Sequence, residues 1–410
     1  LQTRRELIST RAADFQCTLA YTNLIGANDG LIFDGGGWVV QNGKMMLEAP
    51  RFERGYSTAV VDLDRTLRLR AEQTTWRADR DAYLDQFDMP ATLMIPADEF
   101  STETQRAGLV YPVPAQKSFF LPAEQPRITA REQLCEEVLD ALALGVGDYF
   151  EKNKAFGLIG VSLSGGRDSL LALLIAHRYA SSVRPKDPGS LIRAFYQPSR
   201  FSSEATRTAA HTICADLGVP LTIESIDDAF EHEMRAAEAM LDEGQSLTEI
   251  TKQNIQARIR AQRMWNWSNS ASGLFLQTGN MTEKSVGYTT IGGDLMGALG
   301  VLSNVPKTVV MYLLDYLLET RGYPGIAAVL KQPAGPELAP NQRGEDELMP
   351  FPILDACLYL FAGEKMTPDE VELVVAEMFP ELARETVDGY VAKFVRLFLR
   401  SIYKWVQAPL

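Results

Sequence analysis

The pattern of apolar and polar positions changes along the chain near residue 128. Residues 15–64 form short apolar runs broken by glycines, and the pair Asn42-Gly43 between two such runs predicts a β-hairpin. Residues 65–127 are polar and charged and contain six prolines, which is typical of a linker or of surface connections. The first part of the chain is therefore expected to be a β-rich segment followed by a linker.

After residue 128, stretches with helical spacing of apolar residues alternate with short apolar runs. Helices are expected over 131–152, 168–180, 202–218, 227–243 and 247–265, and strands over 157–163, 191–197, 221–226 and 274–280. This alternation predicts an α/β fold, a parallel sheet with helices on both faces. Ligands bind beyond the carboxyl ends of such strands, so the turns that follow them are expected to line a site.

Composition narrows the class of protein. The 410 residues are 46% hydrophobic, enough for one or two cores, and the net charge of −13 disfavours a nucleic-acid partner. No apolar run approaches the roughly 18 residues that span a bilayer, so we expect no membrane partner and a cytoplasmic protein. The four cysteines and three histidines are widely spaced and none has metal-ligand spacing, so a zinc site has almost no ligands available and carboxylates are expected to hold any metal.

The segment VSLSGGRDS, residues 161–169, lies where an expected strand gives way to a helix. Backbone N–H groups at a helix start bind anions such as pyrophosphate, and the Ser164 and Ser169 hydroxyls add donors. Asp168 offers the carboxylate that Mg²⁺ needs beside phosphate oxygens. The alternative is a capped turn whose glycines serve the backbone angles alone.

Three other places carry candidate chemistry. Asn254 and Arg258 form an i,i+4 pair on an expected helix, with Gln256 between them, suited to gripping a polar ligand; the alternative is a solvated basic face. Thr278 ends a strand and Glu283 follows it, so two carboxylates could share magnesium unless Glu283 is only an acid at a helix start. Lys307 could reach a γ-phosphate or be an exposed first-turn lysine.

The pattern SGGxDS resembles the ATP loop of enzymes that cut ATP between its α and β phosphates and leave AMP on an acceptor. The blocks at 252–264, 277–294, 305–308 and 336–355 resemble those of the NAD synthetases, in the same order. The resemblance runs from about residue 128 to the end. It implies an adenine nucleotide α-hydrolase-like synthetase domain at 128–410.

The resemblance also implies site residues. ATP would contact Ser162, Leu163, Ser164, Gly165, Gly166, Arg167, Asp168, Ser169, Thr278 and Lys307. The dinucleotide substrate would contact Asn254, Arg258, Glu283, Tyr288, Thr289, Thr290, Ile291 and Asp294. Asp168 and Glu283 would hold Mg²⁺, and no protein nucleophile is expected in the synthetase. In this family the dinucleotide usually binds across a homodimer interface, so the resemblance implies a homodimer or a higher homo-oligomer.

Residues 22–64 resemble the last strands of the nitrilase-type glutaminase domain that precedes the synthetase in glutamine-dependent NAD synthetases. The implied domains are a glutaminase remnant at 1–64, a linker at 65–127 and the synthetase. Because the chain begins at Leu1, the glutaminase glutamate, lysine and cysteine are expected upstream of it, and a basic tail is expected after its last residue. Cys17 is expected to be a buried structural thiol.

The implied activity is ATP-dependent amidation of nicotinic acid adenine dinucleotide to NAD through an acyl-adenylate, with release of AMP and pyrophosphate. Nitrogen would come from ammonia, or from glutamine in the intact enzyme. Two alternatives remain open. One is another ligase with the same ATP loop, such as a tRNA-modifying enzyme, and the other is a non-catalytic dinucleotide-binding protein.

Overall fold

A computed structural model describes residues 2–28, 30–87, 128–332, 335, 338–339 and 344–409 of the chain. These residues form two compact units. The first comprises Leu1–Gly26 and Ile32–Ile128, and the second comprises Ala27–Leu31 and Thr129–Leu410. Among the described residues, no helix combines the length and apolar character needed to cross a membrane.

An antiparallel sheet and three helices make up the described part of the first unit. Its elements are α1 Gln2–Asp14, β1 Thr18–Thr22, β2 Ile25–Asn28, β3 Leu31–Gln41, β4 Lys44–Arg51, α2 Leu63–Glu72 and α3 Thr74–Phe87. Strand β3 pairs antiparallel with both β1 and β4. Asn42 and Gly43 join β3 to β4 with φ values of 50° and 83°, as a two-residue hairpin turn requires, so the predicted hairpin is confirmed.

The expected linker is partly helical, which corrects the prediction for its first part. Helices α2 and α3 lie within residues 63–87, and the rest of the expected linker, residues 88–127, lies outside the described residues. The linker prediction rested on polar composition and prolines, whereas the α2 sequence LDRTLRLRAE contains several strong helix formers and no proline. The expected domain limits stay predictions.

The second unit contains a five-stranded parallel sheet in the order β7-β6-β5-β8-β9, which confirms the predicted α/β fold. Its strands are β5 Leu158–Leu163, β6 Ile192–Tyr196, β7 Leu221–Ile223, β8 Gly273–Gln277 and β9 Leu299–Gly300. Helix α4 Ala130–Asn153 precedes β5. The helices between the strands up to β8 are α5 Arg167–Val183, the 3-10 turn η2 Pro188–Leu191, α6 Glu204–Leu217, α7 Asp227–Glu238 and α8 Glu249–Ala271.

Opposite faces of the sheet meet different helices. On one face Trp267 of α8 lies across Gly160 and Gly273, and a Cβ atom at Gly160 would be 2.1 Å from the indole. Alternate residues of β5, including Ile159 and Val161, point to the other face and join a large buried core with α5. The glycines thus allow α8 to pack closely on β5 and β8.

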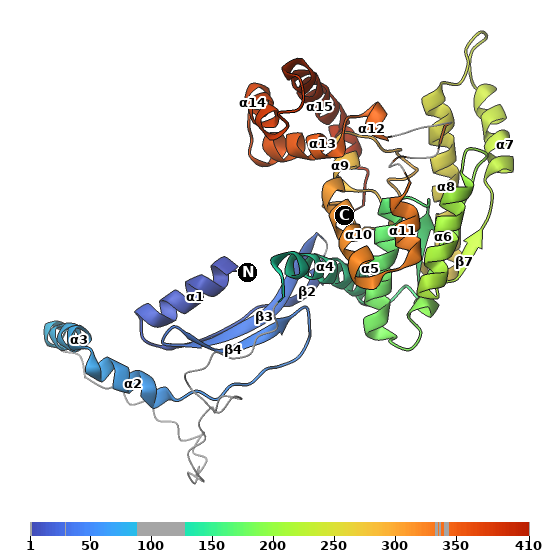
Figure 1. Ribbon diagram of the computed structural model, residues 1–410. Helices are drawn as coiled ribbons and strands as arrows, with labels where there is room; N and C mark the ends of the chain where they lie inside the picture. Colours follow the sequence, from blue (N-terminus) through green and yellow to red (C-terminus); the bar gives the residue numbers. More distant parts are fainter. Residues whose placement is uncertain are drawn as a thin grey trace. The chain divides into compact units, whose positions relative to one another are not determined.

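The C-terminal part of the second unit is helical, and its last helices have a core of their own. It comprises α9 Met281–Ser285, α10 Lys307–Arg321, α11 Pro324–Leu330, α12 Gly344–Glu347, α13 Phe351–Leu358, the π-helical turn η3 Tyr359–Gly363, α14 Pro368–Met378 and α15 Arg384–Trp405. Helices α13, α14 and α15 form one group (Figure 1), and their core includes Phe351, Leu354 and Phe394. Helix α10 packs against both α5 and α13, so it joins this group to the helices of the sheet.

Candidate active site

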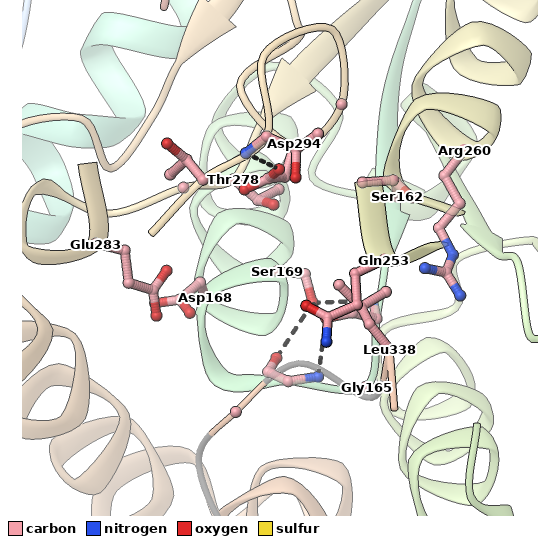
Figure 2. Close-up of a pocket in the computed structure, with 18 of the residues that line it drawn as sticks. Ser162, Gly165, Asp168, Ser169, Gln253, Arg260, Thr278, Glu283, Asp294 and Leu338 are labelled. Atoms are coloured by element: carbon pink, nitrogen blue, oxygen red, sulfur yellow. Dashed lines mark hydrogen bonds between the residues drawn. The ribbon is translucent and has the colours of Figure 1, made fainter. Parts of the chain in front are cut away.

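A cavity of about 820 Å³ opens beyond the carboxyl ends of β5, β6 and β8 (Figure 2). Every residue that the sequence predicted for the site lines this cavity except Gln256, Arg258 and Ile291. The lining residues predicted from sequence are Ser162, Leu163, Ser164, Gly165, Gly166, Arg167, Asp168, Ser169, Asn254, Thr278, Glu283, Tyr288, Thr289, Thr290, Asp294 and Lys307. Segments more than one hundred residues apart in the sequence therefore line one cavity.

The loop between β5 and α5 is held by its own serines. The Gly166 N–H donates to Ser164 Oγ at 3.2 Å, the Ser164 N–H donates to Ser169 Oγ at 3.2 Å, and Ser169 Oγ donates to the Gly166 carbonyl at 3.2 Å. No side chain of the described residues caps the start of α5. The loop thus fixes a helix N-terminus at the cavity wall, an arrangement suited to binding phosphate.

Gly165 makes the sharp turn in this loop. Its φ of +79° lies in the left-handed region, and an added Cβ would stand 2.5 Å from Thr206 Cβ. Gly166 differs, because its φ is −93° and an added Cβ would meet only Ser164 Oγ, at 3.1 Å. The two glycines therefore have unequal roles, and Gly165 is the one that the backbone requires.

Asp168, Glu283 and Lys307 form a buried cluster of charges at the cavity floor. Figure 2 shows Asp168 and Glu283 next to each other, although they come from α5 and α9. The Lys307 ammonium, at the start of α10, donates to Asp168 Oδ2 and to Glu283 Oε1, the latter at 3.0 Å. The side chains of the lysine, the aspartate and the glutamate are only 4%, 19% and 20% exposed.

Burial shifts the pKa of Lys307 and the pKa of Glu283 in opposite directions. Burial alone would lower the pKa of Lys307, but the charges of Asp168 and Glu283 outweigh it and raise that pKa above its usual value. Burial raises the pKa of Glu283, and the lysine opposes this shift only in part. The pKa of Lys307 is governed by charge because its ammonium has two anionic neighbours, whereas burial dominates at Glu283 because two carboxylates share one cation. Lys307 is therefore firmly charged.

The sequence suggested that Lys307 reaches a γ-phosphate, whereas the structure places its ammonium on the two carboxylates expected to hold magnesium. Those carboxylates fit a hard cation, since their oxygens already converge on one positive charge. The described residues contain no group of three or more His, Cys, Asp or Glu side chains arranged to hold a metal. Any Mg²⁺ here would need phosphate or water oxygens as further ligands, which is its usual preference.

Two residues that the sequence reasoning missed hold this cluster in place. Asn280 caps α9 by accepting from the Glu283 N–H at 2.9 Å, and its Nδ2 donates to Asp168 Oδ1 at 3.0 Å. Asp355 of α13 accepts from the Thr308 N–H and from the Thr282 hydroxyl, and the Lys307 N–H donates to that hydroxyl at 2.8 Å. Asparagine just after a strand is a helix-cap signal that could have identified Asn280, but nothing local marks Asp355.

Helix α8 presents one face to the cavity, and the expected Asn254–Arg258 pair does not share it. The cavity face of α8 comprises Ile250, Gln253, Asn254, Ala257, Arg260, Ala261 and Met264. Arg258 lies on the neighbouring face, where its Nε donates to the Ile291 carbonyl at 3.1 Å. At 100° per residue, an i,i+4 pair drifts by about 40°, which carries Arg258 past the edge of the face. Gln256 is also outside the cavity and donates to the Leu338 carbonyl at 2.9 Å.

Arg260 and Gln197 form a second polar contact that sequence reasoning missed. Arg260 Nε donates to the Gln197 carbonyl at 2.9 Å, and Gln197 Nε2 donates to the Arg260 carbonyl at 3.3 Å. The side-chain oxygen of Gln197 is buried and has no hydrogen-bond partner among the described residues. Gln197 directly follows β6, so its place at a strand end was the available signal.

The turn after α9 closes the opposite wall. Thr290 Oγ1 donates to Asn254 Oδ1 at 2.7 Å, and the Thr290 N–H donates to Asp294 Oδ1 at 2.6 Å. Burial raises the pKa of Asp294, while the Thr290 N–H opposes that shift. Tyr288 Oη donates to Glu347 Oε2 at 2.6 Å. The predicted substrate residues of this turn are thus tied to α8 and α12.

Lys404 of α15 holds the same turn from the other side. Its ammonium donates to the Gly287 carbonyl at 2.6 Å and to the Thr289 carbonyl at 2.7 Å. Burial lowers the pKa of Lys404, and the negative charge of Asp294 opposes this shift. The C-terminal helix thereby contributes a cation to the cavity that the sequence reasoning did not name.

Comparison with known proteins is consistent with this geometry. The family model described as NAD synthase matches residues 138–393. The chain is 30% identical to the glutamine-dependent NAD(+) synthetase of Aquifex aeolicus over 414 residues, covering 99% of this chain and 64% of that protein. It is also 30% identical to the Thermotoga maritima protein of the same name, covering 90% of this chain and 58% of that protein.

A solved structure shares the fold. The crystal structure of a glutamine-dependent NAD(+) synthetase from Cytophaga hutchinsonii aligns with a TM-score of 0.72 and 20% identity, covering 98% of this chain and 61% of that one. The chain therefore spans less than two thirds of the length of the relatives described here.

Proposed function

Because the chain belongs to the NAD synthase family, we propose that it catalyses the ATP-dependent amidation of nicotinic acid adenine dinucleotide to NAD. The resemblance noted in the sequence to this family is confirmed by the match over residues 138–393. The observation that carries the proposal is the meeting, in one cavity, of the β5–α5 loop with the carboxylates of Asp168 and Glu283. That combination suits binding and cleavage of a nucleoside triphosphate.

In the proposed reaction the nicotinate carboxylate attacks the α-phosphorus of ATP and pyrophosphate leaves. The loop from Ser164 to Gly166 and the first turn of α5 would bind the departing pyrophosphate through their N–H and hydroxyl groups. Ammonia then displaces AMP from the acyl-adenylate. Catalysis of this kind rests on positioning and charge stabilisation, so it requires no nucleophilic side chain.

Asp168 and Glu283 would hold Mg²⁺, which supplies neutralisation of phosphate charge when bound. Lys307 adds a positive charge beside these carboxylates, and its raised pKa keeps it protonated at neutral pH. Asn254, Tyr288, Thr290 and the rest of the turn that they join would contact the dinucleotide on the opposite wall. Gln197 and Arg260 add polar groups near the ends of β5 and β6, where the nucleoside of ATP would lie.

The test is a product assay with the purified 410-residue chain. Nicotinic acid adenine dinucleotide, MgATP and ammonium are expected to give NAD, AMP and pyrophosphate in equal amounts by chromatography and mass spectrometry. A parallel reaction with glutamine in place of ammonium addresses the nitrogen donor, because the relatives are named glutamine-dependent. ATP consumption without AMP formation would contradict the proposal.

Two control reactions address the alternatives. Unfractionated tRNA as the acceptor should give no pyrophosphate, as the net charge of −13 also suggests. Pyrophosphate release that requires tRNA would point to a tRNA-modifying ligase. Dinucleotide binding without pyrophosphate release would point to a non-catalytic binding protein. We further propose a homodimer, which sedimentation analysis would detect.

A further inference from the structure

Lys307 contacts both carboxylates of the proposed metal site at once. Its ammonium donates to Asp168 Oδ2 and Glu283 Oε1, and the lysine is 3% exposed as a whole residue. The centroid of the Phe351 ring lies 5.3 Å from the same ammonium. Because a divalent cation would need the same carboxylate oxygens, the ammonium and the metal compete for one position.

The main chain of Lys307 is fixed, so any release involves only its side chain. The Lys307 N–H donates to Thr282 Oγ1 at 2.8 Å, and the next residue, Thr308, is bound through both its N–H and its hydroxyl by Asp355. The lysine side chain is a flexible four-carbon chain, so its ammonium can move once another cation neutralises Asp168 and Glu283. The phosphate-binding loop is close, because Asp168 itself lies in the first turn of α5.

Charge decides when such a swing is favourable. If the ammonium leaves while no anion is available, a firmly charged lysine is stranded in a buried place, which is costly. If a triphosphate has bound at the start of α5, its oxygens provide both a new partner for the lysine and the additional ligands that Mg²⁺ requires. The two exchanges thus become favourable together.

We propose that Lys307 is the resident counter-ion of the Asp168–Glu283 pair, which it keeps closed to free divalent metal until nucleotide phosphates accept the lysine. The inference rests on the proposed function, since it takes the ligand to be a nucleoside triphosphate. It assigns Lys307 a role in the order of binding. Metal enters with the nucleotide and not before it.

The test measures Mn²⁺ binding by electron paramagnetic resonance, with no acceptor substrate present. Wild type without nucleotide should bind Mn²⁺ weakly, whereas Lys307→Met should bind one Mn²⁺ about tenfold more tightly or better. Adding α,β-methylene-ATP, which resists cleavage, should give wild type a protein-bound Mn²⁺ signal distinct from that of the Mn²⁺–nucleotide complex. The double variant Asp168→Asn, Lys307→Met should lose the gained site.

Lys404→Met is the matched control. It removes the same charge from the same cavity, but Lys404 binds the carbonyls of Gly287 and Thr289 rather than carboxylates, so no Mn²⁺ site should be gained. Lys307→Gln replaces Lys307→Met if circular dichroism shows that the methionine variant is unfolded. Tight Mn²⁺ binding by nucleotide-free wild type, equal to that of the variant, would overturn the inference whatever the variants do.

The experiments distinguish a failure of this inference from a failure of the proposed function. The Mn²⁺ measurements contain no dinucleotide and no ammonia, so they remain informative if the chain does not amidate. Conversely, NAD formation together with a nucleotide-independent Mn²⁺ site would leave the proposed function standing and remove only the role of Lys307.

Discussion

Asp355 and Thr308 are joined by two hydrogen bonds. Asp355 Oδ2 accepts from the Thr308 N–H at 2.9 Å and from the Thr308 hydroxyl at 2.7 Å, so a carboxylate of α13 binds the first turn of α10. A negative charge at a helix N-terminus is favourable, and this one also fixes the residue next to Lys307. Helix α13 thereby fixes the position of the main chain at Lys307.

We expect Asp355→Asn to lower the free energy of unfolding by about 1–3 kcal/mol, because it removes a charged acceptor from partly buried donors. It should also reduce the rate of NAD formation more than it raises the KM for ATP, since it displaces Lys307 without touching the phosphate loop. Thr308→Val is the control. It keeps the N–H bond, so a smaller effect on both quantities is expected, and equal effects would argue against the role of the carboxylate.

Asp168→Asn and Glu283→Gln should each reduce pyrophosphate release by about 100-fold or more, because each removes an anionic oxygen from the proposed metal site. The size of the side chain is unchanged, so circular dichroism should show a folded protein. Glu249→Gln changes an exposed acid that pairs with Lys252 and should behave like wild type. Near-normal turnover of either site variant at limiting Mg²⁺ would refute the metal assignment.

The two loop glycines should respond differently to alanine. Gly165→Ala forces a methyl group toward Thr206 at a φ of +79°, so we expect loss of ATP binding and a lower melting temperature. Gly166→Ala adds a methyl that meets only Ser164 Oγ at 3.1 Å, and a mild rise in the KM for ATP is expected. Similar results for the two variants, in calorimetry and in ATP titration, would contradict the geometry of the loop.

The stabilisation that Lys307 gains from its carboxylates should depend on pH only in the alkaline range. Because its pKa in the folded protein is raised, this stabilisation is complete below the unfolded value of about 10.4 and is lost as pH rises through the folded value. The difference in melting temperature between wild type and Lys307→Met should therefore stay constant from about pH 7 to about pH 9.5. A wild-type advantage that grows as the pH rises through that range would show that the pKa of Lys307 is lowered in the folded protein, and it would contradict the ion pairs with Asp168 and Glu283.

Thiol reactivity should separate Cys17 from the other cysteines. Cys135, Cys214 and Cys357 are buried, and burial raises the pKa of the Cys214 and Cys357 thiols to about 12. Cys17 is partly exposed, so the expectation of a buried thiol was wrong. It follows Gln16, whose φ of 44° turns the chain at the surface between α1 and β1. A disulfide reagent should modify Cys17 alone in the native protein, and mass spectrometry of peptides would identify the residue.

The spacing of apolar residues is enough to predict the parallel sheet, but it does not predict the cluster of Asp168, Glu283 and Lys307. Strands such as β5 and β8 are continuous apolar runs between helices, so their order in the chain already predicts a parallel sheet. Strand β9 has only two residues, too few to leave a pattern. The position of Lys307 depends on contacts with residues as distant in sequence as Asp168, and such contacts have no local signature.

The face of α8 shows a finer limit. The predicted helix is confirmed and Asn254 lines the cavity, while its role in binding substrate stays a prediction. Asn254 lies at the edge of the cavity face of α8, so the drift of about 40° in an i,i+4 pair places Arg258 outside it, where Arg258 donates to the Ile291 carbonyl. In the block at 336–355, residues 336, 337 and 340–343 lie outside the described residues, so the prediction for that part of the block stays a prediction.

The attachment of Lys404 to the turn at Gly287 and Thr289 has a consequence for the order of assembly during synthesis. The lysine is 117 residues later in the chain than Gly287. A ribosome would therefore have to translate α15 before the wall of the cavity that holds Tyr288 and Thr290 is complete. The β5–α5 loop, which depends on local serines, would be formed earlier, so a nascent chain would acquire its anion-binding half well before its second half.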